Sequence, residues 1–261
     1  MTLQFTDTHC HLDFDNFTPH LNQLLTQCKQ LGVERIIVPS IGPKNWQRVI
    51  ALGQLTSPVS LKIALGIHPW FLEEVTNESL DDLFKLATDH QHEIVAIGEA
   101  GIDGKVADEQ NNLHRQIDVF NAQITLANKL EKPIIVHHRR SHQHIMQILK
   151  QLPCLHGGIV HAFSGSYQQA KTYIDLGFKL GIGGTITYER AKKTINTVRK
   201  LPVESLLLET DAPAMPIKGE QGLDNSPVKL INIFEKLCEI RSESAEELAL
   251  KIEQNLDELF F

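Results

Sequence analysis

The stretch Leu3-Gln4-Phe5-Thr6-Asp7-Thr8-His9-Cys10-His11 begins with a short run of alternating apolar residues and ends in two histidines at positions i and i+2. Residues two apart on an extended chain point to the same side, with Cα atoms about 6–7 Å apart. We therefore expect His9 and His11 to form a clip for one metal ion at the end of a strand. Cys10 points the other way and is expected to be a small buried apolar residue.

The same order, an apolar run followed by polar residues and then a helical stretch, recurs eight times. The predicted strands cover about 3–5, 35–39, 61–66, 94–97, 133–136, 158–160, 178–181 and 205–208. The predicted helices cover about 20–31, 44–55, 79–89, 109–130, 141–151, 167–176 and 188–200, with one or two more within 227–261.

Nearly continuous apolar strands separated by amphipathic helices indicate a parallel sheet that is covered on both faces. Eight such units predict a closed α/β barrel, the (β/α)₈ or TIM barrel, as a single domain over residues 1–261. An open doubly wound sheet is the alternative fold. It would typically carry a glycine-rich phosphate-binding turn after the first strand, and that turn is absent.

Composition narrows the class of protein. The chain has 261 residues with 32 acidic and 25 basic side chains, a formal net charge of −7. A broad groove for duplex nucleic acid would normally show a basic excess. The four cysteines are widely spaced and predict reduced thiols in a cytoplasmic protein. We expect no membrane association, because there is no signal sequence and no apolar run long enough to span a bilayer.

Side chains able to bind metal follow most of the predicted strands, at the end where barrel enzymes place their active sites. They are His9, His11, His68, Glu99, His137, His161 and Asp211. Histidine together with carboxylate suits a pair of divalent ions, with zinc favoured and magnesium or manganese also compatible. No cysteine belongs to the set, which therefore indicates an open, catalytic site in which Glu99 bridges both ions. Periodicity alone does not choose between His137 and His138.

Several motifs along the chain resemble the TatD-related metal-dependent hydrolases, a family of amidohydrolase-like barrels that includes metal-dependent deoxyribonucleases. The motifs are Asp7 to Asp13, Gly66 to Pro69, Gly98 to Asp103, Gln116/Phe120/Gln123, Pro133 to Arg139, His161 to Gly165, Glu209 to Pro213, Asn225 with Pro227, and Asn255 with Phe260. The resemblance runs nearly from end to end, and the motifs are specific when taken together.

The resemblance implies the role of each site residue. One ion is expected between His9, His11, Glu99 and Asp211, and the other between Glu99, His137 and His161. Arg139 takes the position of an arginine that faces the substrate phosphate, and His68 that of a histidine that contacts substrate. The implied activity is that of a 3′–5′ exodeoxyribonuclease on single-stranded DNA or RNA ends, in which a water activated by two metal ions attacks phosphorus and Asp211 acts as general base.

Two other functions stay open. The same metal site could hydrolyse an ester or amide, for instance an aminoacyl ester of RNA, or the barrel could bind metal without catalysis. Small phosphodiesters are an alternative substrate, and no obligate protein partner is evident. The chain also departs from the family pattern at His138, at Arg140, at 104–107 and at Ser226, whereas every expected metal position is intact. These departures bear on the choice of substrate.

Overall fold

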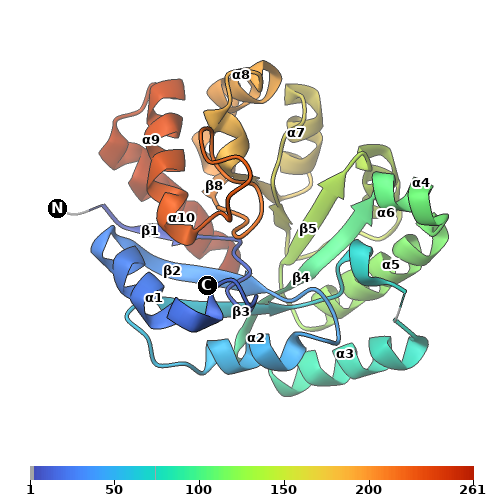
Figure 1. Ribbon diagram of the computed structural model, residues 1–261. Helices are drawn as coiled ribbons and strands as arrows, with labels where there is room; N and C mark the ends of the chain where they lie inside the picture. Colours follow the sequence, from blue (N-terminus) through green and yellow to red (C-terminus); the bar gives the residue numbers. More distant parts are fainter. Residues whose placement is uncertain (1–2, 74) are drawn as a thin grey trace.

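A computed structural model describes residues 3–73 and 75–261, and its framework is one parallel sheet of eight strands in sequence order. Figure 1 shows the strands enclosed by helices. The strands are β1 (Phe5–Asp7), β2 (Val33–Pro39), β3 (Ser60–Leu65), β4 (Ile94–Asp103), β5 (Ile134–Arg139), β6 (Gly158–Val160), β7 (Phe178–Ile182) and β8 (Leu206–Leu208).

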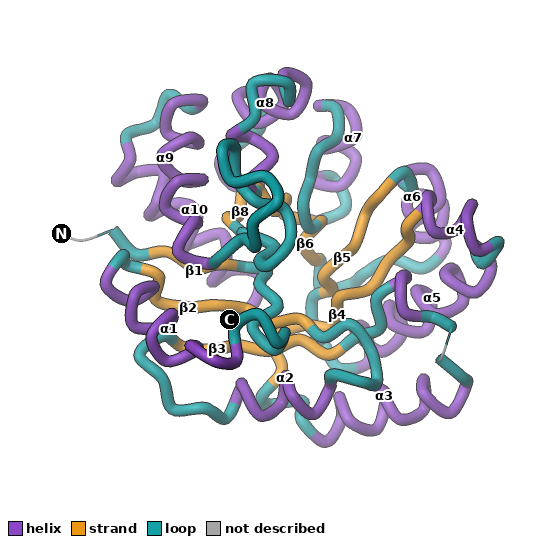
Figure 2. The backbone as a smooth tube through the Cα atoms, in the orientation of Figure 1, coloured by secondary structure: helices purple, strands orange, loops and turns teal. Residues whose placement is uncertain are grey.

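Helices follow the strands and form the outer layer, drawn in purple in Figure 2. They are α1 (Leu21–Gln30), α2 (Trp46–Gly53), α3 (Asn77–Asp89), α4 (Gly104–Gln110), α5 (Leu113–Lys129), α6 (His142–Gln151), α7 (Tyr167–Ile174), α8 (Lys192–Lys200), α9 (Leu230–Ile240) and α10 (Ala245–Phe260). Within the described part of the chain, none of them combines the length and the apolar character that a bilayer crossing requires.

The first and last strands meet through backbone contacts just beyond their ends. The Thr8 amide donates to the Leu208 carbonyl at 2.9 Å, and the His11 amide donates to the Ala212 carbonyl at 2.8 Å. Cys10 and Ala212 form a parallel bridge. These bonds bring β1 beside β8, so the sheet is a nearly closed barrel and the predicted (β/α)₈ fold is confirmed.

Apolar side chains fill the barrel on both sides of its wall. One buried cluster takes residues from alternate positions of the strands and includes Ile37, Ile135 and Leu207, together with Leu256 and Phe260 from α10. A larger cluster joins the other face of the strands to the surrounding helices. Strands that are buried on both faces explain the nearly continuous apolar runs in the sequence.

Strand β4 is longer than predicted. The sequence favoured a strand over 94–97, but β4 continues to Asp103 and stays paired with β5 from Ala100 to its end. Gly98 and Gly101 have φ values of +150° and +142°. Glycine is normally unfavourable in a strand, but here a Cβ on Gly101 would lie 2.3 Å from the His137 carbonyl oxygen. The close approach of β4 and β5 therefore requires glycine at this position, and this requirement outweighs the low preference of glycine for strands.

The helix expected over 109–130 is also different. Residues Gly104–Gln110 form a separate helix, α4, whose first turn is capped by the Asp103 carboxylate through hydrogen bonds from the Lys105 and Val106 amides at 2.9 and 3.0 Å. This helix ends at Asn111, which adopts a left-handed φ of +51°. Helix α5 therefore starts only at Leu113. The other expected helices and strands are present, with shifted ends.

Candidate metal centre

The polar residues predicted at the strand ends converge on one cleft at the carboxyl end of the barrel. Its volume is about 480 Å³, within the usual range for small-ligand sites. His11, His68, Glu99, His137, Arg139, His161 and Asp211 all line it. His9 lies behind this wall, fully buried.

His9, His11, Glu99 and Asp211 form the first group of facing atoms. His9 Nε2 lies 3.2 Å from His11 Nε2 and 3.0 Å from Glu99 Oε2, and His11 Nε2 lies 3.6 Å from the same oxygen. Asp211 Oδ1 is 3.8 Å from each of the two ring nitrogens. Side chains from β4 and from the ends of β1 and β8 thus surround one point.

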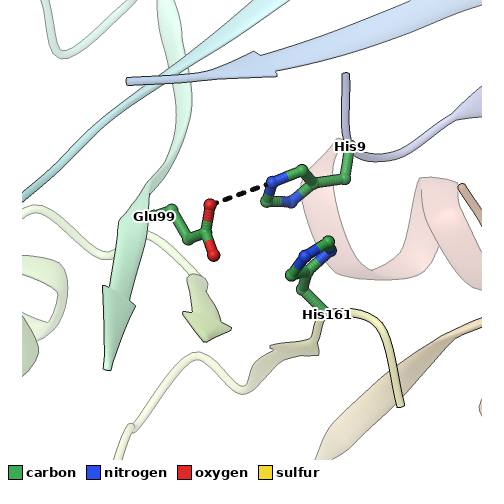
Figure 3. Close-up of side chains that lie close together, drawn as sticks. All are labelled: His9, Glu99 and His161. Carbon is green, nitrogen blue, oxygen red and sulfur yellow. Dashed lines mark ion pairs between the residues drawn. The ribbon is translucent and has the colours of Figure 1, made fainter. Parts of the chain in front are cut away.

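His161 joins this group from the end of β6. Its ring stacks on that of His9, with centroids 3.6 Å apart, and its Nε2 lies 3.6 Å from Asp211 Oδ1. Figure 3 shows the Glu99 carboxylate of β4 facing the His9 and His161 rings. His161, His9 and Glu99 thus form one set of possible ligand atoms that lie within 4.8 Å of one another.

His68, Glu99 and His137 form a second group on the other oxygen of Glu99. His137 Nδ1 lies 3.0 Å from Glu99 Oε1, and His68 Nε2 lies 3.3 Å from Glu99 Oε1 and 3.1 Å from His137 Nδ1. Glu99 therefore offers one oxygen to each group, as expected for a bridging carboxylate. His68, expected from the family pattern to contact substrate, also lies among the candidate donor atoms.

Two buried carboxylates hold histidine rings from behind, and sequence reasoning assigned neither of them a role. Asp103 Oδ2 lies 3.0 Å from His137 Nε2, and Glu209 Oε1 lies 3.1 Å from His161 Nδ1. A carboxylate behind a histidine fixes the ring orientation and raises its basicity in metal sites. The sequence did offer a signal for both carboxylates, because they lie in the strand-end motifs. Asp103 is four residues after Glu99, and Glu209 is two residues before Asp211.

A buried carboxylate also joins the two strand ends that supply the first group. Asp7 accepts hydrogen bonds from the Thr210 amide at 2.9 Å and the Thr210 hydroxyl at 2.6 Å, and from the His9 amide at 3.2 Å. Asp7 precedes His9 by two residues and Thr210 directly precedes Asp211. This contact therefore sets the position of His9 relative to Asp211.

Unusual backbone conformations occur beside the cleft. Arg140, Ala162 and Asp211 have left-handed φ values of +52°, +47° and +59°. Such conformations are unfavourable for residues with a Cβ and are maintained when the surrounding structure determines them. At Asp211 the next residue forms the bridge to Cys10, which holds the chain in place. The left-handed turn directs the Asp211 carboxylate toward the histidines.

Burial and close charges shift the proton affinities within the centre. Burial raises the pKa of Asp211 to about 6, with Glu99 and Glu209 adding to the shift. Burial alone would raise the pKa of Glu99 too, but the imidazoles of His68 and His9 outweigh it and hold that pKa well below its ordinary value. Burial lowers the pKa of His68 to about 4. The carboxylates and imidazoles of the centre thus compete for protons at one buried point, where a bound cation could take the place of the protons as the balancing charge.

The spacing of the donor atoms fits a metal ion. Ligands about 2.0–2.1 Å from a tetrahedral ion lie about 3.4 Å from one another. The distances that join His9 Nε2 and His11 Nε2 to each other and to the nearest Glu99 and Asp211 oxygens run from 3.0 to 3.8 Å. Three sets of donor atoms in the described residues lie close enough to bind an ion, namely His9/Glu99/His161, His9/His11/Asp211 and His68/Glu99/His137. The centre therefore suits divalent metal binding.

Comparison with known proteins identifies the family of the chain. A model of the TatD related DNase family matches residues 6–261. The chain belongs to this family. It is 43% identical over 260 residues to YjjV of Escherichia coli K12, named an uncharacterized metal-dependent hydrolase, and covers 99% of that protein with 100% of its own length. The family resemblance predicted from the sequence is confirmed.

Two further comparisons support the fold and the class of activity. The crystal structure of E. coli YjjV, a TatD homologue, superposes with a TM-score of 0.95 over 100% of this chain and 99% of that one. A protein of Pantoea vagans named 3′-5′ ssDNA/RNA exonuclease TatD is 30% identical over 261 residues, with 97% of this chain and 98% of that protein covered. The TatD-family chain is a metal-dependent hydrolase with a barrel fold.

Proposed function

We propose that this TatD-family hydrolase cleaves phosphodiester bonds and trims single-stranded DNA or RNA from its 3′ end. The observation that carries the proposal is a cleft that places a candidate metal centre, an arginine and exposed aromatic rings side by side. A strand end presents the matching groups, which are a phosphodiester, the charge of the backbone and a flat base. The acidic surface agrees with a pocket for a strand end rather than a groove for a long duplex.

Arg139 supplies the phosphate contact in this proposal. Its side chain is 45% exposed, lines the cleft and keeps its Nη1 3.8 Å from Asp103 Oδ2. Asp103 also contacts His137, so the arginine is held next to the second group of donor atoms. A guanidinium can bind two phosphate oxygens at once, and this contact orients the substrate for attack.

Trp70 and Phe71 form an apolar wall of the cleft, and each is 45% exposed. The Trp70 indole donates from Nε1 to Asp103 Oδ2 at 2.7 Å, which fixes the ring against the same carboxylate that holds His137. Stacking of a base on an aromatic side chain contributes about 1–3 kcal/mol and tolerates any base. The wall thus suits the terminal base of a strand without a sequence requirement.

The family resemblance assigns the remaining roles: His9, His11, Glu99 and Asp211 would hold one divalent ion, and Glu99, His137 and His161 the other. In the structure, His161 lies beside His9 and Asp211, and His68 joins Glu99 and His137. Zinc, magnesium or manganese is compatible with these ligands. When bound, the ions supply Lewis acidity for the attack of water on phosphorus. Asp211 accepts a proton from the attacking water as general base, a role that its place in the lining of the cleft allows.

The relative from P. vagans supports the choice of substrate, because its name states an exonuclease activity on single-stranded DNA and RNA. The similarity spans nearly the full length of both chains. Ester or amide hydrolysis is the competing function, and it would leave Arg139 without a clear role.

The test is Asp211→Asn, assayed with short 3′-ended oligonucleotides beside measurement of bound metal. We expect the variant to lose hydrolysis by about a hundredfold or more, because removal of a general base costs about 10²–10⁴-fold. A variant that keeps its metal and hydrolyses phosphodiesters at the wild-type rate would show that the proposed role of Asp211 is wrong.

A phosphodiester chromophore and a carboxylic ester chromophore, compared under the same metal, separate the two functions. The proposal expects turnover of the phosphodiester and little of the ester. Preference for the ester would instead assign the centre to carbonyl chemistry.

A further inference from the structure

A second cleft of about 620 Å³ opens beside the candidate metal centre. The two clefts share three lining residues, His138, Arg139 and Ser164, and are therefore adjacent. Residues 141–144, at the start of α6, form another part of its wall. The backbone N–H groups of a first helical turn add partial positive charge there.

The side chains of this second cleft carry positive charge only. Arg139, Arg140 and Lys193 line it, and among the described residues no aspartate or glutamate does. The chain as a whole has a net charge of −7. The acidic side chains that the structure describes thus lie outside this cleft. The charged side chains that line the cleft are positive, although the chain as a whole is negative.

Arg140 and Lys193 are exposed, and neither side chain makes an ion pair or a hydrogen bond within residues 3–73 and 75–261. The two come from the end of β5 and from α8, more than fifty positions apart in the sequence. Many other cations of the chain are paired, as Lys171 is with Asp175. Two unpaired cations that converge on one cleft are available to bind an anion.

We propose that this second cleft binds the backbone phosphates that precede the scissile bond, so that the substrate is an oligonucleotide rather than a small phosphodiester. The inference rests on the proposed phosphodiesterase function and deepens it. Arg139, which borders both clefts, lies where the strand passes from one to the other. Phosphate contacts of this kind position a strand without reading its sequence.

The test neutralises the two unpaired cations with Arg140→Gln and Lys193→Gln in one variant. The control is Lys150→Gln with Lys192→Gln, which removes the same charge from exposed side chains outside both clefts. A single-stranded octadeoxynucleotide and a single-phosphodiester chromophore serve as the two probes. Lys192 precedes Lys193 on the same helix, so the control matches both the charge and the helix.

We expect the variant to bind the octanucleotide about tenfold more weakly than wild type, since each exposed ion contact contributes up to about fivefold. The slope of log affinity against log salt should fall by about 0.7 for each lost contact. Turnover of the chromophore should stay at the wild-type value, and the control should resemble wild type with both probes. Equal octanucleotide affinity in variant and control would overturn the proposal, as would an equal loss with both probes.

Binding of a labelled octanucleotide to EDTA-treated protein makes the result independent of catalysis. If wild type binds the strand more tightly than the variant but cleaves no phosphodiester, the proposed function fails while the phosphate-binding cleft is supported. If wild type cleaves the chromophore and the variant binds the strand as the control does, the function stands and the second cleft is wrong.

Discussion

At the carboxyl end of the barrel, His9, Glu99 and Asp211 turn their polar atoms toward one another, whereas Arg35 and Glu253 at the opposite end form a closed network. Glu253 accepts from the Thr6 amide and hydroxyl, both at 2.8 Å, and from Arg35 Nη2 at 2.8 Å. Every partner in that network is a protein group. At the carboxyl end, Asp211 Oδ1 lies 3.6 Å from His161 Nε2 and 3.8 Å from the Nε2 atoms of His9 and His11, which is beyond hydrogen-bond distance.

The difference shows that charged groups in one fold can serve stability at one end and chemistry at the other. A network that satisfies its own donors and acceptors needs no further ligand. A buried set of carboxylates and imidazoles that face one common point can instead hold a cation, as the donor sets around His9, Glu99 and Asp211 do in their spacing. Barrels of this type place their active sites at the carboxyl ends of the strands, whereas contacts at the amino ends of the strands serve stability.

The largest effect at the carboxyl end is expected from His9→Ala combined with His11→Ala. Loss of both rings should empty the ion position next to Asp211 first, because two imidazole ligands are removed and only Glu99, Asp211 and the neighbouring His161 would remain there. Bound metal per chain, measured by elemental analysis after dialysis, should fall, and turnover should drop below detection. Circular dichroism checks that the fold is retained. Unchanged metal content in a folded variant would contradict this assignment.

A smaller effect is expected from Glu209→Gln, which keeps the shape of the side chain and removes its charge. Glu209 accepts from the Ala162 amide at 2.5 Å and lies 3.1 Å from His161 Nδ1. Loss of such a supporting carboxylate typically costs about 10–100-fold in metal affinity or activity. Metal titration measures the loss of affinity, and Glu258→Gln, at an exposed side chain of α10, is the control. Wild-type affinity and rate in the variant would mean that Glu209 has no part in the centre.

The smallest effect on the centre is expected from Glu253→Ala, at the other end of the barrel. The Thr6 amide and Arg35 lose an acceptor, so the free energy of unfolding should fall by about 1–3 kcal/mol. Metal affinity should not change. Denaturant unfolding measures the loss, and Glu258→Ala, whose carboxylate forms an exposed pair with Lys179, is the control with an effect of at most about 1 kcal/mol. A changed metal affinity in Glu253→Ala would contradict the conclusion that this end of the barrel serves stability and not the metal centre.

Much of the fold could be predicted from the sequence because each strand is a local apolar run and each helix has a local period. The misplaced boundaries have a nonlocal cause. Strand β4 reaches Asp103 because β5 pairs with it, although Gly98 and Gly101 argue locally against a strand. The start of α5 was set too early because the left-handed turn at Asn111 separates it from α4.

The candidate site could be predicted in part for the same reason. Parallel strands deliver their ends to one edge of the sheet, so the sequence predicted that His9, His11 and Glu99 lie together. The pairing of Asp103 with His137, and of Glu209 with His161, depends on rotamers and neighbouring strands. Spacing along the chain does not contain that information.

The sequence by itself determined the eight βα units, the family and the kinds of side chain at each strand end, since these depend on local periodicity and residue chemistry. Tertiary structure alone decided which atoms face one another. It put His68 against Glu99 and His137, and it brought Arg140, just after β5, and Lys193 of α8 to one cleft without a carboxylate among its described lining residues. The reason is that barrel closure fixes distances between residues far apart in the chain, and these distances determine what can bind.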